Sequence, residues 1–254
     1  MRRALLAVLL AGATFFLCSC GNAQPRAGLR GANEKIKVVI VTGGHGFDKA
    51  AFLAVFDAFA DVKYVEAKQA DDSEIFEDIS KWDYDVIVLY NMGQKISPKR
   101  QENFVKLLKK GVGVVAMHHS IGAFQDWKTY PKIIGGKYYL RSMTENGVKH
   151  EASKYKDNVK MEVKVEDQQH PITRGLKDFV ITDETYKQCS FQRDNHVLLS
   201  TDAPTNDKPV CWVRKYGKSR ICYFQFGHGP KAYGDSNFRI LTARAIRWSA
   251  GRLN

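Results

Sequence analysis

The segment Val112-Gly-Val-Val-Ala-Met117 is an almost purely apolar run that leads directly into His118-His119-Ser120. Such a run is typical of a strand that is buried on both faces of a parallel sheet. The residues before it predict a helix, because Ser97 can cap it, Pro98 suits its first turn and Gly111 can end it. A buried strand that follows an amphipathic helix indicates a fold of the α/β class.

The same pattern recurs toward the N-terminus. The β-branched run from Ile36 to Val41 ends in Thr42-Gly43-Gly44-His45-Gly46, and residues 85–90 form another apolar run. Between them, residues 49–59 place apolar side chains at helical spacing, and residues 62–66 are a further short strand candidate. Three alternations of strand and helix predict a parallel sheet with right-handed crossovers.

After Gly136 the pattern changes. Residues 159–165 alternate as Val-Lys-Met-Glu-Val-Lys-Val, which predicts a half-exposed antiparallel strand. Two more short strands, a hairpin and a closing helix are expected at residues 179–181, 197–199, 210–226 and 237–249. The sequence therefore predicts one doubly wound domain with antiparallel additions.

The first residues are expected to be a targeting segment. Arg2 and Arg3 precede an apolar run, Ala4 to Leu17, which is too short to span a bilayer comfortably. The residues Leu17-Cys18-Ser19-Cys20-Gly21 resemble the lipobox of bacterial lipoproteins, although Cys18 stands where Ala, Ser or Thr is usual. This resemblance implies lipidation of Cys20. The alternative is an ordinary signal peptide that is cleaved near Ala23.

Three parts of the chain follow from this interpretation: a lipoprotein signal peptide at residues 1–19, a flexible tether at 20–34, and one domain at 35–254. The protein would be exported and anchored in a membrane by its lipid. Because no acidic run follows Cys20, we expect it to face the periplasm.

The charge pattern gives no support for nucleic-acid binding. The formal net charge is +12, but lysines and arginines are scattered among acidic residues. The sequence has no basic helix, no RNA-binding aromatic motif and no zinc-finger spacing. A solvated basic surface near an anionic membrane is the simpler interpretation.

Cys211 and Cys222 flank the expected hairpin turn at residues 216–219. They face each other only if the loop is centred on Tyr216-Gly217. A Gly217-Lys218 loop, which suits a glycine in the first position, would offset them. The sequence leaves this disulfide undecided.

Candidate site residues follow the expected strands. Open parallel sheets bind ligands outside the carboxyl ends of their strands, and histidine is both the side chain most easily poised for proton transfer and the commonest metal ligand. Adjacent side chains at a strand end usually point apart, so His118 rather than His119 is expected to face the pocket. The candidates at strand ends are His45, Asp48, His118, His119, Glu184, Tyr186 and His228. Histidines 150, 170 and 196 lie in polar loops and are expected to be solvated.

The sequence lacks the motifs of several common enzyme activities. The turn at residues 43–46 is not a dinucleotide fingerprint, because the order G-x-G-x-x-G is missing. No phosphate-binding loop with its lysine and no G-x-S-x-G elbow occurs.

Six short motifs resemble the ThuA-like (trehalose utilisation) family in their order. They are Val-Thr-Gly-Gly-His-Gly-Phe (41–47), Gly-Val-Val-Ala-Met-His-His-Ser-Ile-Gly-Ala-Phe-Gln-Asp-Trp (113–127), Ile-Gly-Gly-Lys-Tyr (134–138), His-Pro-Ile-Thr-Arg-Gly-Leu (170–176), Asp-Glu-Thr-Tyr (183–186) and Phe-Gly-His-Gly (226–229). The resemblance covers nearly all of residues 36–250. The motif positions that match are His45, His118, Asp126, Trp127, Glu184 and His228.

The resemblance implies a flavodoxin-like, class I glutamine amidotransferase-like fold: a three-layer sandwich with a central, mostly parallel sheet and antiparallel additions. It also implies a link to trehalose and related glycosides, including glycosides oxidised at a ring hydroxyl. Glutamine amidotransferase activity is not expected. Those enzymes carry a nucleophilic cysteine after the strand that here ends at Met117, where this chain has His118-His119-Ser120.

We therefore expect an enzyme that cleaves a disaccharide or keto-glycoside by hydrolysis or elimination. His118 or Glu184 would act as base and His228 as acid or oxyanion partner. Trp127 would be the sugar platform, among the substrate-binding candidates His45, Asp48, His119, Asp126, Trp127 and Tyr186.

A second version of this hypothesis places a divalent metal such as zinc on His45, His118 and His228. Two further hypotheses remain open. The protein could be a non-catalytic, glycoside-binding lipoprotein, which the aromatic residues Phe47, Phe124, Trp127, Tyr186 and Phe226 would serve equally well. It could also be a structural partner subunit, which would neither bind nor turn over a sugar.

Overall fold

The computed structural model describes residues 34–69, 73–145 and 147–254. The expected signal peptide at 1–19, the lipidation of Cys20 and all but the last residue of the tether lie outside the described residues. Within the described part of the chain, no helix is long and apolar enough to cross a membrane.

A nine-stranded mixed sheet forms the centre of the molecule, in the order β2-β1-β3-β4-β13-β12-β11-β8-β9. The strands β2, β1, β3, β4 and β13 pair in parallel. Their order is that of flavodoxin-like sheets. We call these strands the parallel half: β1 Ile36–Gly43, β2 Val62–Lys68, β3 Val86–Asn91, β4 Gly113–Met117 and β13 Ser219–Phe224.

The remaining strands of this sheet pair antiparallel, each with its neighbour. We call them the antiparallel half: β8 Lys154–Val165, β9 Phe179–Lys187, β11 His196–Ser200 and β12 Pro209–Tyr216. The structure thus confirms an α/β fold in which a parallel sheet carries antiparallel additions. Two small two-stranded sheets pair β5 Gly136–Lys137 with β10 Ser190–Phe191, and β6 Met143–Glu145 with β7 Val148–His150.

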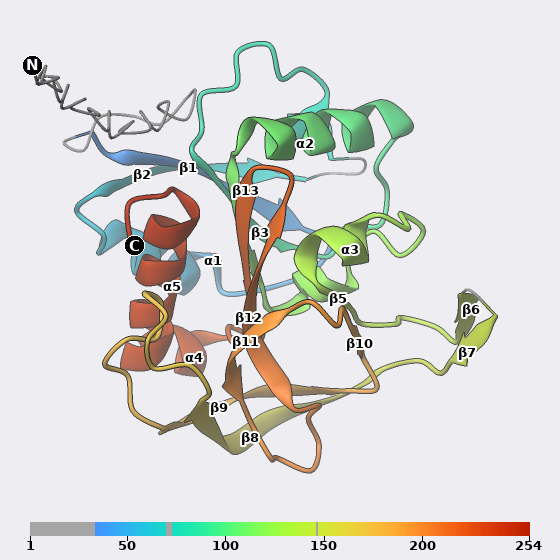
Figure 1. Cartoon of the computed structure of the whole chain (residues 1–254), viewed down its shortest axis with the longest axis vertical. Helices are drawn as coiled ribbons and strands as arrows, with labels where there is room; N and C mark the ends of the chain where they lie inside the picture. Colours follow the sequence, from blue (N-terminus) through green and yellow to red (C-terminus); the bar gives the residue numbers. More distant parts are fainter. Residues whose placement is uncertain (1–33, 70–72, 146) are drawn as a thin grey trace, which may run out of the picture.

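Helices cover both faces of the parallel half (Figure 1). On one face, α1 Lys49–Asp57, α4 Pro230–Gly234 and α5 Ser236–Ser249 pack on a core that includes Val38 and Ile40. On the other face, α2 Pro98–Lys110 and α3 Tyr130–Ile134 pack on a core that includes Val39 and Val41. Successive residues of β1 face opposite cores, as the period of a strand requires, and the result is a three-layer sandwich. Two short 3-10 turns complete the element list, η1 Glu74–Phe76 and η2 His118–Gly122.

One strand is longer than the sequence predicts, and this changes where a site residue lies. The short strand expected at residues 179–181 continues to Lys187, because β9 pairs with β8 from Phe179↔Val163 to Lys187↔Lys154. Glu184 therefore lies within a strand rather than in the loop after it.

The hairpin of β12 and β13 answers the question about the cysteines. Tyr216 pairs with Ser219, so the loop is Gly217-Lys218, with Gly217 at φ +59° in its first position. Cys211 lies opposite Phe224 and Cys222 opposite Val213, and both thiols are free and buried. Burial raises the pKa of the Cys211 thiol well above its usual value, which makes it unreactive.

Candidate active site

The site begins where β4 ends. His118 follows Met117 with φ +52°, a left-handed conformation that is uncommon for a residue other than glycine. Such a residue costs on the order of 1–3 kcal/mol and occurs often at functional sites. The turn brings the chain straight into η2, so the alternation of the strand does not continue. The expectation was that His118 rather than His119 would face the pocket, but His119 lines the cavity and the fully buried His118 lies behind the lining residues.

The ring of His118 is fixed in one tautomer. Its Nδ1 lies 2.8 Å from the backbone oxygen of Gln225, and because a carbonyl only accepts, Nδ1 carries the hydrogen. Burial lowers the pKa of His118 well below its usual value, so the ring is neutral. The lone pair of Nε2 is therefore free to accept a proton or to bind a metal.

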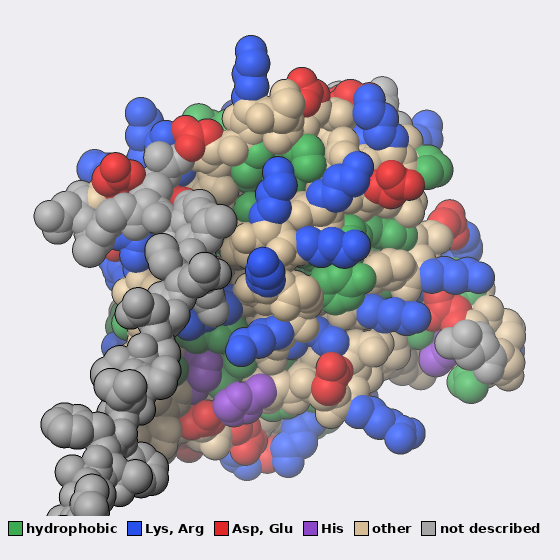
Figure 2. Space-filling view, turned by 45° about the horizontal axis from the view of Figure 1, so that its top comes forward, with side chains coloured by type: hydrophobic (Ala, Val, Ile, Leu, Met, Phe, Trp, Pro, Cys, Tyr) green, Lys and Arg blue, Asp and Glu red, His purple; other side chains and the backbone are tan. Residues whose placement is uncertain are grey.

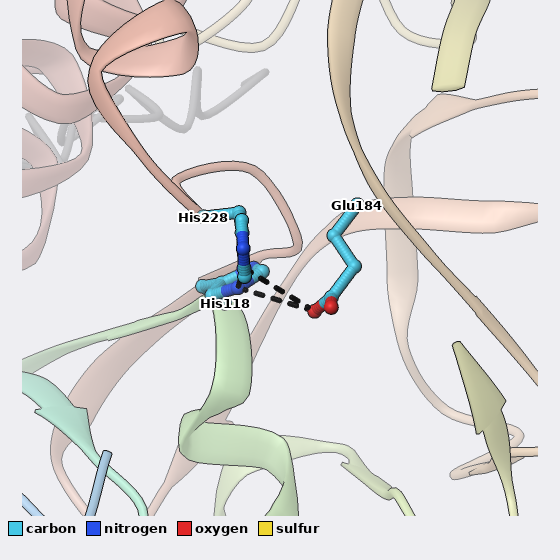
Figure 3. Close-up of side chains that lie close together, drawn as sticks. All are labelled: His118, Glu184 and His228. Atoms are coloured by element: carbon cyan, nitrogen blue, oxygen red, sulfur yellow. Dashed lines mark hydrogen bonds and ion pairs between the residues drawn. The ribbon is translucent and has the colours of Figure 1, made fainter. Parts of the chain in front are cut away.

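Two atoms from distant parts of the chain approach His118 Nε2 and form a group of three with it (Figure 3). His118 Nε2 lies 3.2 Å from His228 Nδ1 and 3.4 Å from Glu184 Oε2, and the latter two atoms are 3.6 Å apart. Zinc binds nitrogen and oxygen ligands at ~2.0–2.2 Å in tetrahedral geometry, so two such ligand atoms lie about 3.3–3.5 Å apart. The spacing of the three atoms is that of three ligands of one zinc ion.

A buried carboxylate holds this arrangement in place. Asp183 accepts hydrogen bonds from the backbone N–H groups of Gly227 (2.6 Å), His228 (3.0 Å) and Glu184 (2.9 Å). Burial raises the pKa of Asp183 to about 6, against the opposing effect of these donors. The side chain of Asp183 thus positions Glu184 and His228 through their backbone. Asp183 was not among the site residues predicted from the sequence.

Tyr186 completes the surroundings of the three atoms. Its ring stacks on that of His118 with centroids 5.3 Å apart, and its hydroxyl lies 3.1 Å from His118 Nε2. The hydroxyl also hydrogen-bonds Glu184. Burial raises the pKa of the Glu184 carboxyl, and the neighbouring His228 opposes this effect.

Two further imidazoles stand beside the three atoms. His119 is 4% exposed and stacks on His45 with ring centroids 4.4 Å apart. Burial lowers the pKa of His119 to about 3 and also lowers that of His45. Neither ring nitrogen of His119 has a hydrogen bond of good geometry to another described residue, so this neutral ring is able to bind a polar ligand.

A cavity of about 540 Å³ opens in front of these residues, within the range of small-molecule sites. No lysine or arginine is among the described residues that line it. This is unlike the outer surface, where Figure 2 shows lysine and arginine side chains over much of one face. The lining residues are His45, Met92, His119, Ile121, Gly122, Tyr138, Leu140, Tyr155, Asp157, Glu184, Tyr186 and His228, with His118 buried behind them.

Three of the expected substrate-binding residues lie outside the cavity. Asp48 caps α1 by accepting from Ala51 N. Asp126 is exposed and pairs with Arg141. Trp127 is buried in the core that includes α2 and α3, so it cannot be a sugar platform.

The expected metal ligands also need correction. Glu184, rather than His45, joins His118 and His228, because the ring of His45 is held in its stack on His119. The aromatic residues Phe47, Phe124 and Phe226 pack in the cores rather than in the cavity. The three histidines expected to be solvated differ: His196 is exposed, whereas His150 stacks on Tyr139 and His170 is half-buried against Trp248.

Sequence reasoning missed several apolar or aromatic residues that line the cavity, among them Met92, Tyr138, Leu140 and Tyr155. Met92 directly follows β3 at the carboxyl edge of the parallel half, so its position could have been found. The others lie in the irregular segment after α3 and at the start of β8, and no periodic pattern marks them.

Fold and site together define a flavodoxin-like α/β protein whose pocket lies at the carboxyl ends of its parallel strands. The model of the ThuA family, described as trehalose utilisation, matches residues 37–249. This chain therefore belongs to the ThuA family.

Solved structures show the same fold at low identity. A ThuA-like protein of Parabacteroides merdae is similar, with a TM-score of 0.72 and 18% identity over 87% of this chain and 92% of that one. A ThuA-like protein of Bacteroides uniformis has a TM-score of 0.60 and 21% identity over 87% and 94% of the two chains. A cytoplasmic protein of Salmonella typhimurium has a TM-score of 0.60 and 10% identity over 84% and 99%. No curated protein matches the chain.

Proposed function

We propose that this protein is an enzyme of carbohydrate metabolism that cleaves or modifies a disaccharide or keto-glycoside with the help of a divalent metal such as zinc. The observation that carries the proposal is the convergence of His118 Nε2, His228 Nδ1 and Glu184 Oε2 beside a ligand-sized cavity that Glu184 and His228 line. Two histidines and one carboxylate are a ligand set found in catalytic zinc sites and in non-haem iron sites.

The chemistry of the three atoms favours a metal over acid–base catalysis alone. His118 Nε2 has no hydrogen to donate, and an ionised Glu184 only accepts. Of the three residues, His228 alone can place a hydrogen between them while Glu184 is ionised, and the hydroxyl of Tyr186 can donate one more, to His118 Nε2 or to Glu184. A divalent cation satisfies all three at once, and its binding would displace the hydrogen of His228.

A metal held there would polarise a sugar oxygen or lower the pKa of a bound water. The chain's own residues would hold and orient the sugar beside it. His45 and His119 are neutral and can each accept or donate a hydrogen bond to a sugar hydroxyl. In a keto-glycoside, the carbonyl acidifies the neighbouring C–H, so the more exposed imidazole of His45 could take up its proton.

The charge of the cavity supports an uncharged sugar. It has two carboxylates, Asp157 and Glu184, and no lysine or arginine among its described lining residues. A phosphate or carboxylate on the substrate would find only a metal to balance it. Membership of a trehalose-utilisation family agrees with a neutral glycoside.

Monosaccharide release tests the proposal. The purified protein would be incubated with native and ring-oxidised disaccharides, with and without a chelator, and its metal content would be measured. Release that stops on chelation and returns with zinc would support the metal site. Release that survives complete metal removal would favour acid–base catalysis by His118, Glu184 and His228.

Two other outcomes would replace the proposal. Saturable sugar binding without any product over long incubation would indicate the non-catalytic, glycoside-binding alternative. A folded protein that neither binds nor turns over any sugar would indicate a structural partner subunit.

We also propose that the protein is exported and anchored by a lipid on Cys20, facing the periplasm. The proposal rests on the lipobox-like residues 17–21. Metabolic labelling with a fatty-acid analogue tests it. Label that depends on Cys20 and fractionates with membranes would support the anchor, and a soluble, unlabelled periplasmic form would support cleavage near Ala23.

A further inference from the structure

The cavity is lined by two chemically different kinds of residue. Besides the histidines and carboxylates, the lining has the large apolar or aromatic side chains of Met92, Ile121, Tyr138, Leu140 and Tyr155, which together we call the apolar wall. They come from the end of β3, from η2, from the segment after β5 and from the start of β8. The proposed function uses the histidines and leaves this wall without a role.

A glycine lies among the side chains of the wall. A Cβ added at Gly122 would lie 3.2 Å from Met92 Cε, 3.7 Å from Tyr138 Cδ1 and 3.9 Å from Leu140 Cδ2. Three apolar side-chain ends thus meet around the glycine, and the gap between them holds no more than one carbon atom. These side chains therefore form a closely packed apolar surface on which an apolar group of a ligand could lie.

The apolar wall contacts the surroundings of the proposed metal site. The ring of Tyr138 contacts that of Tyr186 edge-on, with centroids 5.1 Å apart, and Tyr186 stacks on His118. One aromatic ring therefore separates the apolar wall from the three converging atoms. A ligand of the size of a glycoside could touch both.

The wall offers carbon surface and few hydrogen bonds. Leu140 is 41% exposed and Tyr155 is 67% exposed, although both line a concave site. The hydroxyl of Tyr138 already donates to the backbone oxygen of Ser153. A second sugar ring placed here would lose water from its hydroxyls with few partners in exchange, which is unfavourable. An aromatic or aliphatic group would bury apolar surface instead, which is favourable.

We propose that the apolar wall is a subsite for the aglycone of the substrate, and that this aglycone is an aromatic or other apolar group rather than a second sugar. The proposal rests on the proposed function for the position of the sugar ring, which would lie against His45, His119 and the metal. The glycosidic bond would then lie between these residues and the apolar wall.

Matched ligands test this subsite by calorimetry, without any need for turnover. Methyl and phenyl glucopyranosides of both anomers would be titrated into the purified, zinc-loaded protein, and phenol alone would be a third probe. We expect the phenyl glycoside of one anomer to bind roughly tenfold more tightly than its methyl counterpart, because its ring buries apolar surface.

Variants assign that preference to the wall. In a Leu140→Ser, Tyr155→Ser double variant, which removes apolar surface from the wall, the ratio of the two affinities should fall to near one. Val148→Ser is the matched control, because Val148 is an apolar side chain that is 56% exposed but lies outside the cavity. That variant should keep the full ratio.

The possible outcomes distinguish a failure of the aglycone subsite from a failure of the proposed function. Equal affinity for phenyl and methyl glycosides, or a preference that persists in the double variant, would overturn the subsite and leave the glycoside site intact. Binding of phenol that the double variant loses, without binding of either glycoside, would support the subsite and overturn the glycoside. No binding of any of the three probes would overturn both.

Discussion

The parallel and antiparallel halves of the sheet contribute differently to the site. The parallel half places His45 and His118 by local rules, because each follows a buried strand at the edge where such sheets bind ligands. The antiparallel half places Glu184 through the long-range pairing of β9 with β8. His228 follows β13, at the boundary between the halves, and is fixed by Asp183 of β9. A site built in this way requires both halves.

The largest effect is expected when His118, a metal ligand from the parallel half, is replaced. His118→Asn should lower zinc affinity by at least about 100-fold and abolish turnover, since it removes one of three ligands. Asparagine tolerates the left-handed conformation of this position and can donate to the backbone oxygen of Gln225, so the fold should persist. Zinc titration and circular dichroism check the two parts, and full zinc affinity in a folded variant would remove His118 from the site.

The next largest effect is expected at Asp183, the residue of the antiparallel half that positions Glu184 and His228. Asp183→Asn should lower zinc affinity by about 10–100-fold, because an amide cannot accept all three backbone hydrogen bonds that position Glu184 and His228. Asp202→Asn, an exposed change in the same half, is the control. If high zinc restores the full turnover number of Asp183→Asn, the residue acts by positioning; a turnover number that stays low would assign it a direct role.

A smaller effect is expected on the substrate side of the parallel half. His119→Phe should weaken sugar binding by roughly tenfold, a typical loss for one hydrogen-bonding group, while zinc affinity stays within about twofold of the wild type. Calorimetry with sugar and with zinc measures both. A loss of zinc affinity as large as that of His118→Asn would instead make His119 a metal ligand.

The smallest effect belongs to a surface pair on the edge of the parallel half, away from the site. The hydrogen bond from Arg247 is the largest cause that lowers the pKa of Asp61. The pair therefore stabilises the fold above the pKa of an unfolded aspartate, about 3.9, and this contribution is lost as pH falls through the lower folded pKa. Since both side chains are partly solvated, Arg247→Met should cost less than about 1 kcal/mol at pH 7.

Urea unfolding of wild type and Arg247→Met, at pH 7 and again below pH 3, measures this difference. A cost that does not shrink at low pH would assign the contribution to packing of the arginine stem rather than to its charge.

Sequence and structure agree best where one strand or helix decides the result. The apolar runs at 36–41, 85–90 and 112–117 are the central parallel strands. Helix α2 begins at Pro98 and ends before Gly111 as predicted, although the side chain of Ser97 makes no capping hydrogen bond. Local periodicity and the positions of proline and glycine carry this information, because burial on both faces of a strand leaves an uninterrupted apolar run.

The site was less predictable because its geometry is not local. His118, Glu184 and His228 could be proposed from their strand ends, but no spacing in the sequence shows that Glu184 approaches closer than His45. Trp127 was misplaced because a tryptophan in a family motif is as useful for packing as for binding, and here it fills the core under α3. Asp183 acts on backbone groups 44 and 45 residues away, which only the folded chain reveals.

The number of zinc ions bound per chain tests the central claim most directly. The wild type, Glu184→Gln and His45→Asn would each be loaded with zinc and dialysed, and their zinc content would be measured by inductively coupled plasma mass spectrometry. A site shared by both halves predicts one zinc ion per wild-type chain, one in His45→Asn and none in Glu184→Gln. One zinc ion in Glu184→Gln and none in His45→Asn would place the metal on the parallel half alone, and no zinc in the wild type would contradict a zinc site altogether.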